Sequence, residues 1–137
     1  MKCLIILLLV FSIKNYSQRK NYFPDSDKNP NCSLINNGSF NSDDKNTLKV
    51  KFHHNKMIEI LGDKETITIE SKLKMLDKCK FETEIISIKT KLELKDDLMY
   101  LGKKTEYKIV ETGENYIILE YPCNDDRNTC TEILDKE

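Results

Sequence analysis

The sequence is poor in several residue types that specialised sites require. It has no tryptophan, four glycines, three prolines and two histidines in 137 residues. With no tryptophan and only 8% aromatic residues, a core must rest on isoleucine, leucine, phenylalanine and tyrosine. No glycine-rich phosphate loop and no Gly-x-Ser-x-Gly nucleophile motif occurs. The 22 basic and 23 acidic residues are interspersed, so no basic stripe indicates nucleic acid as a partner.

One long apolar run is present, at residues 4–13 (LIILLLVFSI). Lys2 precedes it and a polar stretch at residues 14–18 follows, which is the layout of a secretory signal peptide. The run is too short to span a bilayer as a helix, and no later run is long enough. We predict that residues 1–17 are a signal peptide, cleaved after Ser17, and that the mature chain is extracytoplasmic, either periplasmic or secreted.

Cleavage there leaves a chain of modest size. Residues 1–17 hold two of the basic residues and none of the acidic ones, so the remaining 120 residues carry a formal net charge of −3. That length suits one domain. Residues 18–37 are polar and contain Pro24 and Pro30, which predicts a flexible lead-in. Residues 38–137 are then a single β-rich domain.

Four cysteines remain in the mature chain, because Cys3 leaves with the signal peptide. Four thiols allow three disulfide connectivities. A zinc site, the alternative, needs closely spaced Cys-x-x-Cys pairs or nearby histidines, whereas six residues separate even the closest pair here. An oxidising compartment favours disulfides. We predict the pairs Cys32–Cys79 and Cys123–Cys130, since the first ties the lead-in to the sheet.

Alternating polar and apolar residues dominate the domain and are typical of strands with one buried face. A shift of the apolar positions near residues 85–86 predicts a β-bulge, and residues 91–101 are a short helix or a loop. Short strands joined by turns predict an antiparallel up-and-down meander, closed into a small barrel or bent into a half-barrel. The expected strands cover residues 47–52, 56–61, 65–75, 79–88, 105–110, 116–121 and 129–134. Their shared interior face is expected to hold Phe40, Ile67, Ile69, Leu73, Phe81, Ile109 and Ile118.

Two short motifs suggest a family. Residues 32–40 (CSLINNGSF) form a C-x5-G-x-F opening before the first expected strand, and residues 71–81 (SKLKMLDKCKF) place a Cys-x-aromatic unit after a break. With the strand at 116–121, they resemble a family of small, uncharacterised exported bacterial proteins with a lipocalin-like β-meander, some of them mislabelled as DNA topoisomerase IV. The resemblance implies a lipocalin-like barrel, in which Gly38 lets the chain bend tightly and Phe40 plugs the closed end.

The residues offer little that could carry chemistry. His53 and His54 are neighbours before Asn55, and we interpret them as solvated turn residues and not as metal ligands. We predict no catalytic residues, no cofactor and no metal site, and therefore no enzyme. A non-catalytic interaction protein of the envelope or the secreted fraction fits best. The alternative is a carrier that holds a small apolar ligand inside the barrel. An unknown protein or a small apolar ligand is thus the expected partner.

Overall fold

The computed structural model describes residues 21–62, 64–91, 97–124 and 127–137. The predicted signal peptide at residues 1–17 lies outside these residues. Within the described part, no helix is long and apolar enough to cross a membrane.

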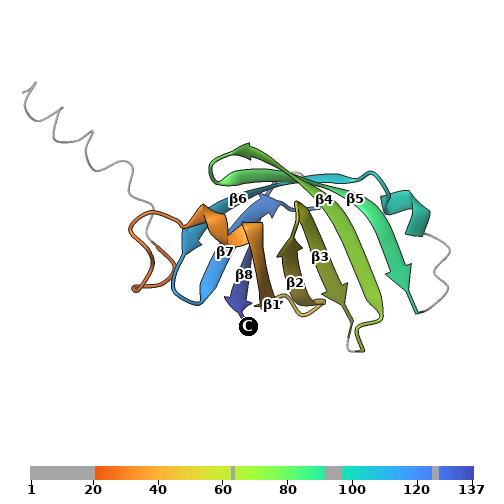
Figure 1. The fold of residues 1–137 in the computed structure, drawn as a ribbon, viewed down its shortest axis with the longest axis horizontal. Coiled ribbons are helices and arrows are strands. Elements are labelled where there is room, and N and C mark those ends of the chain that lie inside the picture. The colour runs from red at the N-terminus through yellow and green to blue at the C-terminus, as the bar shows by residue number, and fades with distance from the viewer. Residues whose placement is uncertain (1–20, 63, 92–96, 125–126) are drawn as a thin grey trace, which may run out of the picture.

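In the described part of the chain, eight antiparallel strands close into a barrel in which each strand pairs with the next (Figure 1). The first and last strands pair through Ser42 and Leu134, which closes the ring. The predicted all-β, up-and-down meander is therefore confirmed, and of its two forms the closed barrel is the one present. The elements are η1 (Cys32–Asn36), β1 (Asn37–Ser42), β2 (Thr47–His53), β3 (Lys56–Leu61), β4 (Ile67–Asp77), β5 (Lys80–Thr90), η2 (Asp97–Tyr100), β6 (Lys104–Thr112), β7 (Tyr116–Pro122) and β8 (Thr129–Lys136).

Most strand limits lie within two residues of those expected from the alternating pattern. The tight turn between β2 and β3 consists of His54 and Asn55, both with positive φ, as the two-residue hairpin geometry requires. The predicted bulge is also confirmed. Ser71 pairs with Ile85 and its neighbour Glu70 pairs with Ser87, so one residue of β5 between them has no partner on β4.

The first strand was misplaced in the prediction. Residues 38–40 were taken as an opening ahead of the first strand, whereas they lie inside β1 and pair with β2. Gly38 has no positive φ, so a tight bend is not its role. A Cβ at this position would lie 2.7 Å from the Phe40 ring, so glycine is needed for close approach of that ring.

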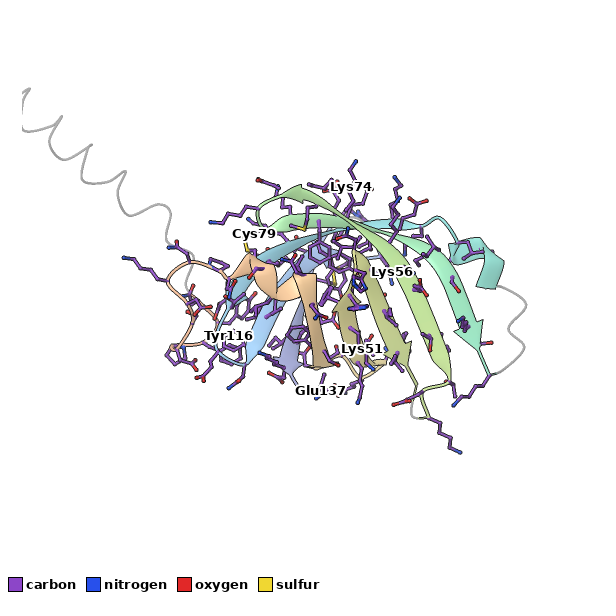
Figure 2. The ribbon with its side chains drawn as sticks, in the orientation of Figure 1. Lys51, Lys56, Lys74, Cys79, Tyr116 and Glu137 are labelled. Carbon is purple, nitrogen blue, oxygen red and sulfur yellow. A yellow bond between two sulfur atoms is a disulfide. The ribbon has the colours of Figure 1, made fainter. Side chains whose placement is uncertain are left out.

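The end of the barrel beside η1 is packed with apolar side chains (Figure 2). A row of rings runs through it: Phe40–Phe52 at 5.9 Å between centroids, Phe52–Phe81 at 6.2 Å and Phe81–Tyr107 at 5.1 Å. Phe40 is almost completely buried, in agreement with its predicted role as a plug. This half of the barrel is a closed core.

The predicted interior list is right in part. Phe40, Leu73, Phe81 and Ile109 belong to the buried core, and Ile67 and Ile69 are only half-buried. The prediction that Ile118 shares the interior face was wrong. Ile118 is buried, but it lies on the face of β7 opposite the core residues Ile117 and Leu119. Three consecutive apolar residues offer no alternation from which to choose the inner face, so the pattern was ambiguous there.

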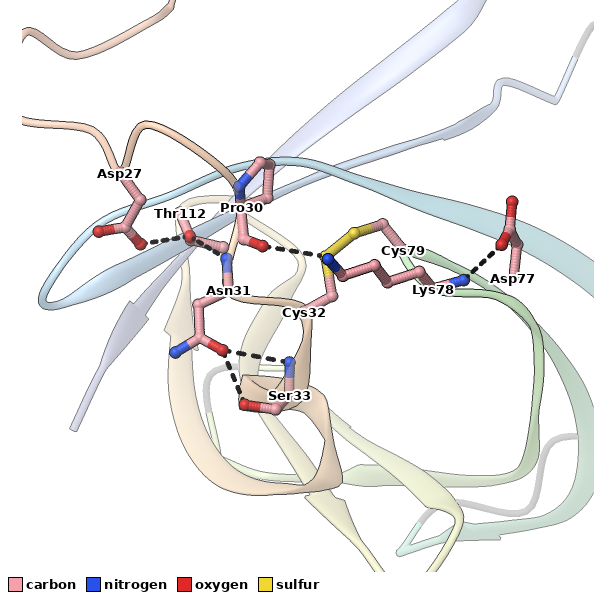
Figure 3. Close-up of a disulfide and its surroundings, with 9 residues drawn as sticks. All are labelled: Asp27, Pro30, Asn31, Cys32, Ser33, Asp77, Lys78, Cys79 and Thr112. Carbon is pink, nitrogen blue, oxygen red and sulfur yellow. Dashed lines mark hydrogen bonds between the residues drawn. A yellow bond between two sulfur atoms is a disulfide. The ribbon is translucent and has the colours of Figure 1, made fainter.

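Both predicted disulfides are present. Cys32 and Cys79 are bonded with their Cα atoms 5.3 Å apart, which joins η1 to the turn between β4 and β5 (Figure 3). Cys123 and Cys130 are bonded with their Cα atoms 5.1 Å apart and close the hairpin of β7 and β8. The first bond holds the cap of the barrel to its wall. The presence of two disulfides suits an oxidising environment outside the cytoplasm.

The segment before η1 makes specific contacts with the end of β6. The Glu111 carboxylate accepts hydrogen bonds from the backbone N–H groups of Tyr22 (2.6 Å) and Phe23 (2.9 Å). Thr112 donates its hydroxyl hydrogen to Asp27 at 2.5 Å and accepts one from the backbone N–H of Asn31 at 2.7 Å (Figure 3). The lead-in that was predicted to be flexible is therefore tied, over its described residues, to the barrel wall.

Candidate functional site

Polar and ionisable side chains face the barrel interior in the half away from η1. Glu59 stands in register with Val50 on β2 and Ile69 on β4, which places it on the inner face. Glu132 lies two residues before the core residue Leu134 and therefore shares its face. Tyr107 on β6 borders the apolar core, and the ring of Tyr121 on β7 lies beside it. Charged residues inside a small barrel are unusual, which makes this cluster the candidate site. We call Glu59, Glu132, Tyr107 and Tyr121 the inner acidic cluster.

Glu59 is enclosed by protein but not sealed from water. Protein surrounds it on nearly all sides, yet its side chain keeps an intermediate exposure. It makes no hydrogen bond or ion pair with any described residue, and no fully buried polar atom of the described chain lacks a partner, so water reaches the carboxylate. Burial, followed by the negative charges of Glu132 and Asp44, raises the pKa of Glu59 to about 7. Glu59 is therefore an inward carboxyl that water reaches and that has no partner among the described residues.

Glu132 is the second acid of the cluster and has little solvent-exposed surface. The Ser42 hydroxyl donates a hydrogen bond to its carboxylate. Burial raises the pKa of Glu132, the Ser42 hydrogen bond lowers it, and the charges of Asp44 and Asp43 raise it again. The charges that act on Glu59 and on Glu132 are thus all negative. The site holds two carboxyls with no basic partner among the described residues.

Two tyrosines form the aromatic wall of the site. The rings of Tyr107 and Tyr121 are 5.3 Å apart, and Tyr107 also stacks on Phe81, so the wall continues the row of rings from the core. Neither hydroxyl has a hydrogen-bond partner in the described part of the chain. Burial, and then the charges of Glu59 and Glu132, raise the pKa of Tyr107. Both hydroxyls are therefore protonated donors that remain available.

A surface cleft lies outside this aromatic wall. Its volume is about 320 Å³, and Tyr107 and Tyr121 line it together with Arg127 and Asn128 of the β7–β8 hairpin. The pairing of β6 with β7 starts at Lys108 and Glu120, so the strands are not paired beside the tyrosines. Tyr107 and Tyr121 thus belong both to the inner acidic cluster and to the lining of this cleft.

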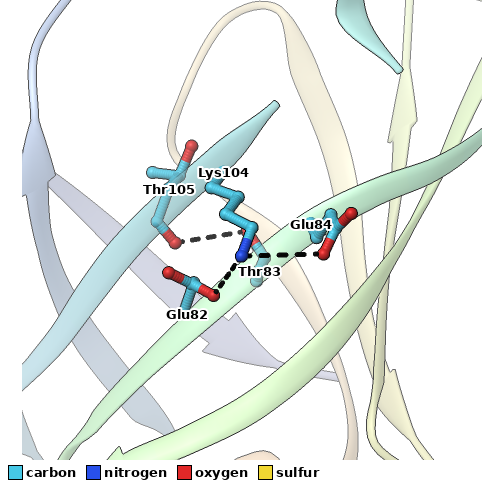
Figure 4. A network of polar contacts seen from close by, with 5 residues as sticks. All are labelled: Glu82, Thr83, Glu84, Lys104 and Thr105. Carbon is cyan, nitrogen blue, oxygen red and sulfur yellow. Dashed lines mark hydrogen bonds and ion pairs between the residues drawn. The ribbon is translucent and has the colours of Figure 1, made fainter. Parts of the chain in front are cut away.

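A second cleft of about 460 Å³ adjoins the first and shares Glu106 and Pro122 with it. On its wall the Lys104 ammonium lies 3.2 Å from Glu82 and 3.9 Å from Glu84 (Figure 4). These exposed ion pairs contribute about 0–1 kcal/mol each to stability. Here the positive charge of Lys104 lies beside the negative charges of Glu82 and Glu84, whereas no basic residue of the described chain pairs with Glu59 or Glu132.

The residues singled out from the sequence lie elsewhere. The four cysteines are structural disulfides, and both histidines are exposed at the β2–β3 turn, where the His53 ring contacts Asn37 at 3.3 Å. Among the described residues, no three His, Cys, Asp or Glu side chains come together as a metal site.

Sequence reasoning missed the inner acidic cluster although a signal was present. Residues 57, 59 and 61 alternate on the inner face of β3, and Glu59 is the one charged member of that set. Residues 130, 132 and 134 on β8 contain Glu132 in the same way. A charged residue at a core position of the alternating pattern was the sign of a site.

Comparison with known proteins adds no relationship: no family model, curated protein or solved structure matches the chain. The resemblance to the family of exported bacterial proteins therefore stays a prediction.

Proposed function

We propose that this chain is an exported, non-catalytic carrier that holds a small ligand in the half of the barrel away from η1. The observation that supports this most is Glu59, which is enclosed by protein, accessible to water and without a partner. A barrel filled only for stability would place an apolar residue at that position, since an unpaired buried carboxyl costs free energy. Half-buried Ile67 and Ile69 beside it supply apolar surface for the body of a ligand.

Export is part of the same proposal. Residues 1–17 have the layout of a signal peptide, and the two disulfides suit an oxidising compartment. N-terminal sequencing of the exported protein should begin at Gln18. A mature protein that still carries Met1 would contradict this part of the proposal.

Native mass spectrometry of the protein purified from its source tests the carrier function. We expect a small-molecule adduct that is lost in Ile69→Trp, because Ile69 pairs with Glu59 across β3 and β4 and a larger ring there would occupy the space that a ligand beside Glu59 needs. The matched control is Ile58→Trp, which enlarges an outward residue of β3 and should keep the adduct. An adduct that persists in Ile69→Trp, or its absence from the wild-type protein, would contradict the proposal.

A second candidate function is the interaction protein favoured by the sequence. A separate observation supports it: Ile86, Met99, Tyr100 and Leu101 are exposed, Met99 by 80%. The backbone N–H of Gly102 bonds to the carbonyl of Ile85 at 2.8 Å, which holds these residues near one another. An exposed apolar patch of this kind suits a protein partner. Chemical cross-linking in the source cell, with Met99→Ser as the test variant and Lys45→Ser as control, decides whether the patch is used.

A further inference from the structure

Two neighbouring strands of the barrel separate and leave part of β6 unpaired on one side. β6 pairs with β7 only from Lys108 and Glu120 onward, and none of the described residues pairs with the earlier part of β6 on that side. We propose that an extended segment of a partner protein binds here by adding a strand to residues 104–106, which we call the β6 edge. This interaction goes beyond the carrier function and does not depend on it.

The first step of the argument is the direction of the backbone groups at the β6 edge. β6 is antiparallel to β5, and the backbone N–H of Ile109 bonds to the carbonyl of Cys79 on the β5 side at 2.9 Å. In an antiparallel pair of strands, hydrogen-bonded residue pairs alternate with pairs whose N–H and C=O groups point away from each other. Counting back from Ile109, every second residue bonds to β5. Lys104 and Glu106 therefore direct their N–H and C=O groups away from β5, toward β7.

The second step is the reason why β7 does not pair with the β6 edge. Continuing the register of Lys108 with Glu120 by two residues places Glu106 opposite Pro122. Proline has no N–H, so Pro122 cannot donate a hydrogen bond to the Glu106 carbonyl, and the pairing ends there. A disulfide holds the end of β7 to β8. The fold thus keeps the β6 edge open.

The third step is the space beside the β6 edge. The clefts of about 320 and 460 Å³ lie between β6 and the end of β7, and Glu106 and Pro122 line both of them. These volumes fall within the roughly 300–1,000 Å³ that is typical of ligand sites. A row of backbone N–H and C=O groups along a strand edge is a template for another extended backbone. An extended peptide segment is therefore the ligand that matches both the space and its hydrogen-bonding groups.

The fourth step concerns the side chains of the partner. Alternate side chains of an added strand point inward, toward Tyr107 and Tyr121, which line the cleft with rings 5.3 Å apart. An apolar or aromatic side chain packs well on such rings. The outward side chains lie beside Lys104 and Glu106, which are exposed and opposite in charge, so uncharged polar residues suit these positions. The partner segment should alternate apolar and polar residues.

A synthetic peptide of about seven residues, the length of an ordinary strand, tests the proposal. In this peptide threonine alternates with valine, tyrosine replaces the central valine, and both ends are blocked. Hydrogen exchange followed by NMR is measured on the disulfide-intact mature protein. The amides of Lys104 and Glu106 should exchange rapidly in the free protein and at least about tenfold more slowly when the peptide is bound. The amide of Tyr107, which faces β5, should exchange slowly in both states.

Backbone methylation of the peptide separates strand addition from side-chain contacts. Methyl groups on the nitrogens of the two threonines beside the tyrosine remove the N–H groups that face β6. This change should weaken binding at least about tenfold in NMR titrations. The matched control carries its methyl groups on the two valines, whose N–H groups point away from β6, and should bind like the unmodified peptide.

Two variants of the protein test the same bonds from the other side. Glu106→Pro removes an N–H of the β6 edge and should weaken binding at least about tenfold. Glu106→Ala keeps that N–H while losing the carboxylate, so it should bind like wild type. An NMR spectrum of each free variant shows whether it keeps the native fold. If Glu106→Pro fails to fold, the methylated peptides carry the comparison.

Three outcomes would overturn the proposal. The first is a lack of binding by the unmodified peptide up to about 10 mM. The second is equal binding of the two methylated peptides, because the contact would then not use the β6 edge. The third is protection of Lys104 and Glu106 that rises with protein concentration in the absence of peptide, since a second copy of this chain would then be the occupant. The carrier function is judged separately, by the native mass spectrum of the source protein.

Discussion

Replacing Glu59 with glutamine should remove a pH dependence of stability that the wild-type protein has. The folded-state pKa of Glu59 is about 7, and its ordinary value is 4.5. The folded protein therefore binds more protons than the unfolded chain between these values. Stability from this group is greatest at low pH and is lost as pH rises through about 7.

The size of the effect follows from the two pKa values. From about pH 5 to about pH 8, a single group with this shift changes the free energy of unfolding by at most about 2.5 kcal/mol. Water reaches the Glu59 carboxylate and screens it, so we expect about 1–2 kcal/mol. The groups that face it are Glu132, Asp44 and Tyr107, and none of them is basic.

Urea unfolding at the two pH values measures this difference. Wild type should lose more stability between about pH 5 and pH 8 than Glu59→Gln does, by about 1–2 kcal/mol. Glu114→Gln should behave like wild type, because its carboxyl is exposed. The reasoning is refuted if Glu59→Gln and wild type have the same pH dependence, or if wild type becomes more stable than the variant as pH rises.

Three further predictions concern the stability of the folded barrel. Phe81→Ala should lower the free energy of unfolding by about 3–5 kcal/mol in urea titrations, since Phe81 is fully buried, and a cost below about 1 kcal/mol would remove it from the core. Replacing Cys32 and Cys79 together with serine should cost up to about 4 kcal/mol, because their bond closes a loop with a sequence separation of 47; unchanged urea unfolding would contradict this. His54→Gly should raise the free energy of unfolding by about 0.5–1 kcal/mol, because the φ angle of His54 is +48° and glycine adopts this conformation without strain. The control His53→Gly, in β2, should not raise it, and equal effects of the two changes would refute the argument.

Much of the fold could be predicted because a strand records its buried face in every second residue. The ranges of β2 and β3 followed from such alternation, and the bulge at residues 85–86 followed from its interruption. The disulfide of Cys32 and Cys79 could be chosen because each cysteine stands at the edge of an expected element. The pairing of β1 with β8 followed only from the general tendency of such meanders to close.

The rest depended on contacts that a local pattern does not contain. The face of Ile118 is undetermined in a run of three apolar residues, and the tie between Glu111 and the backbone of Tyr22 joins positions 89 residues apart. The inner acidic cluster brings Glu59 and Glu132 together from β3 and β8, two strands that are not neighbours in the sheet. The alternating pattern shows a charged residue at an inner position of each strand, but it does not show that the two strands face one interior, which requires the closed barrel.

A crystal structure of the mature protein purified from its source tests the carrier function most directly. The account predicts non-protein density inside the barrel, in contact with the Glu59 carboxylate and the Tyr107 ring. Glu59 should keep its inward position between Val50 and Ile69. An interior in which protein side chains fill this space, with Glu59 turned outward or hydrogen-bonded to the chain itself, would contradict the account.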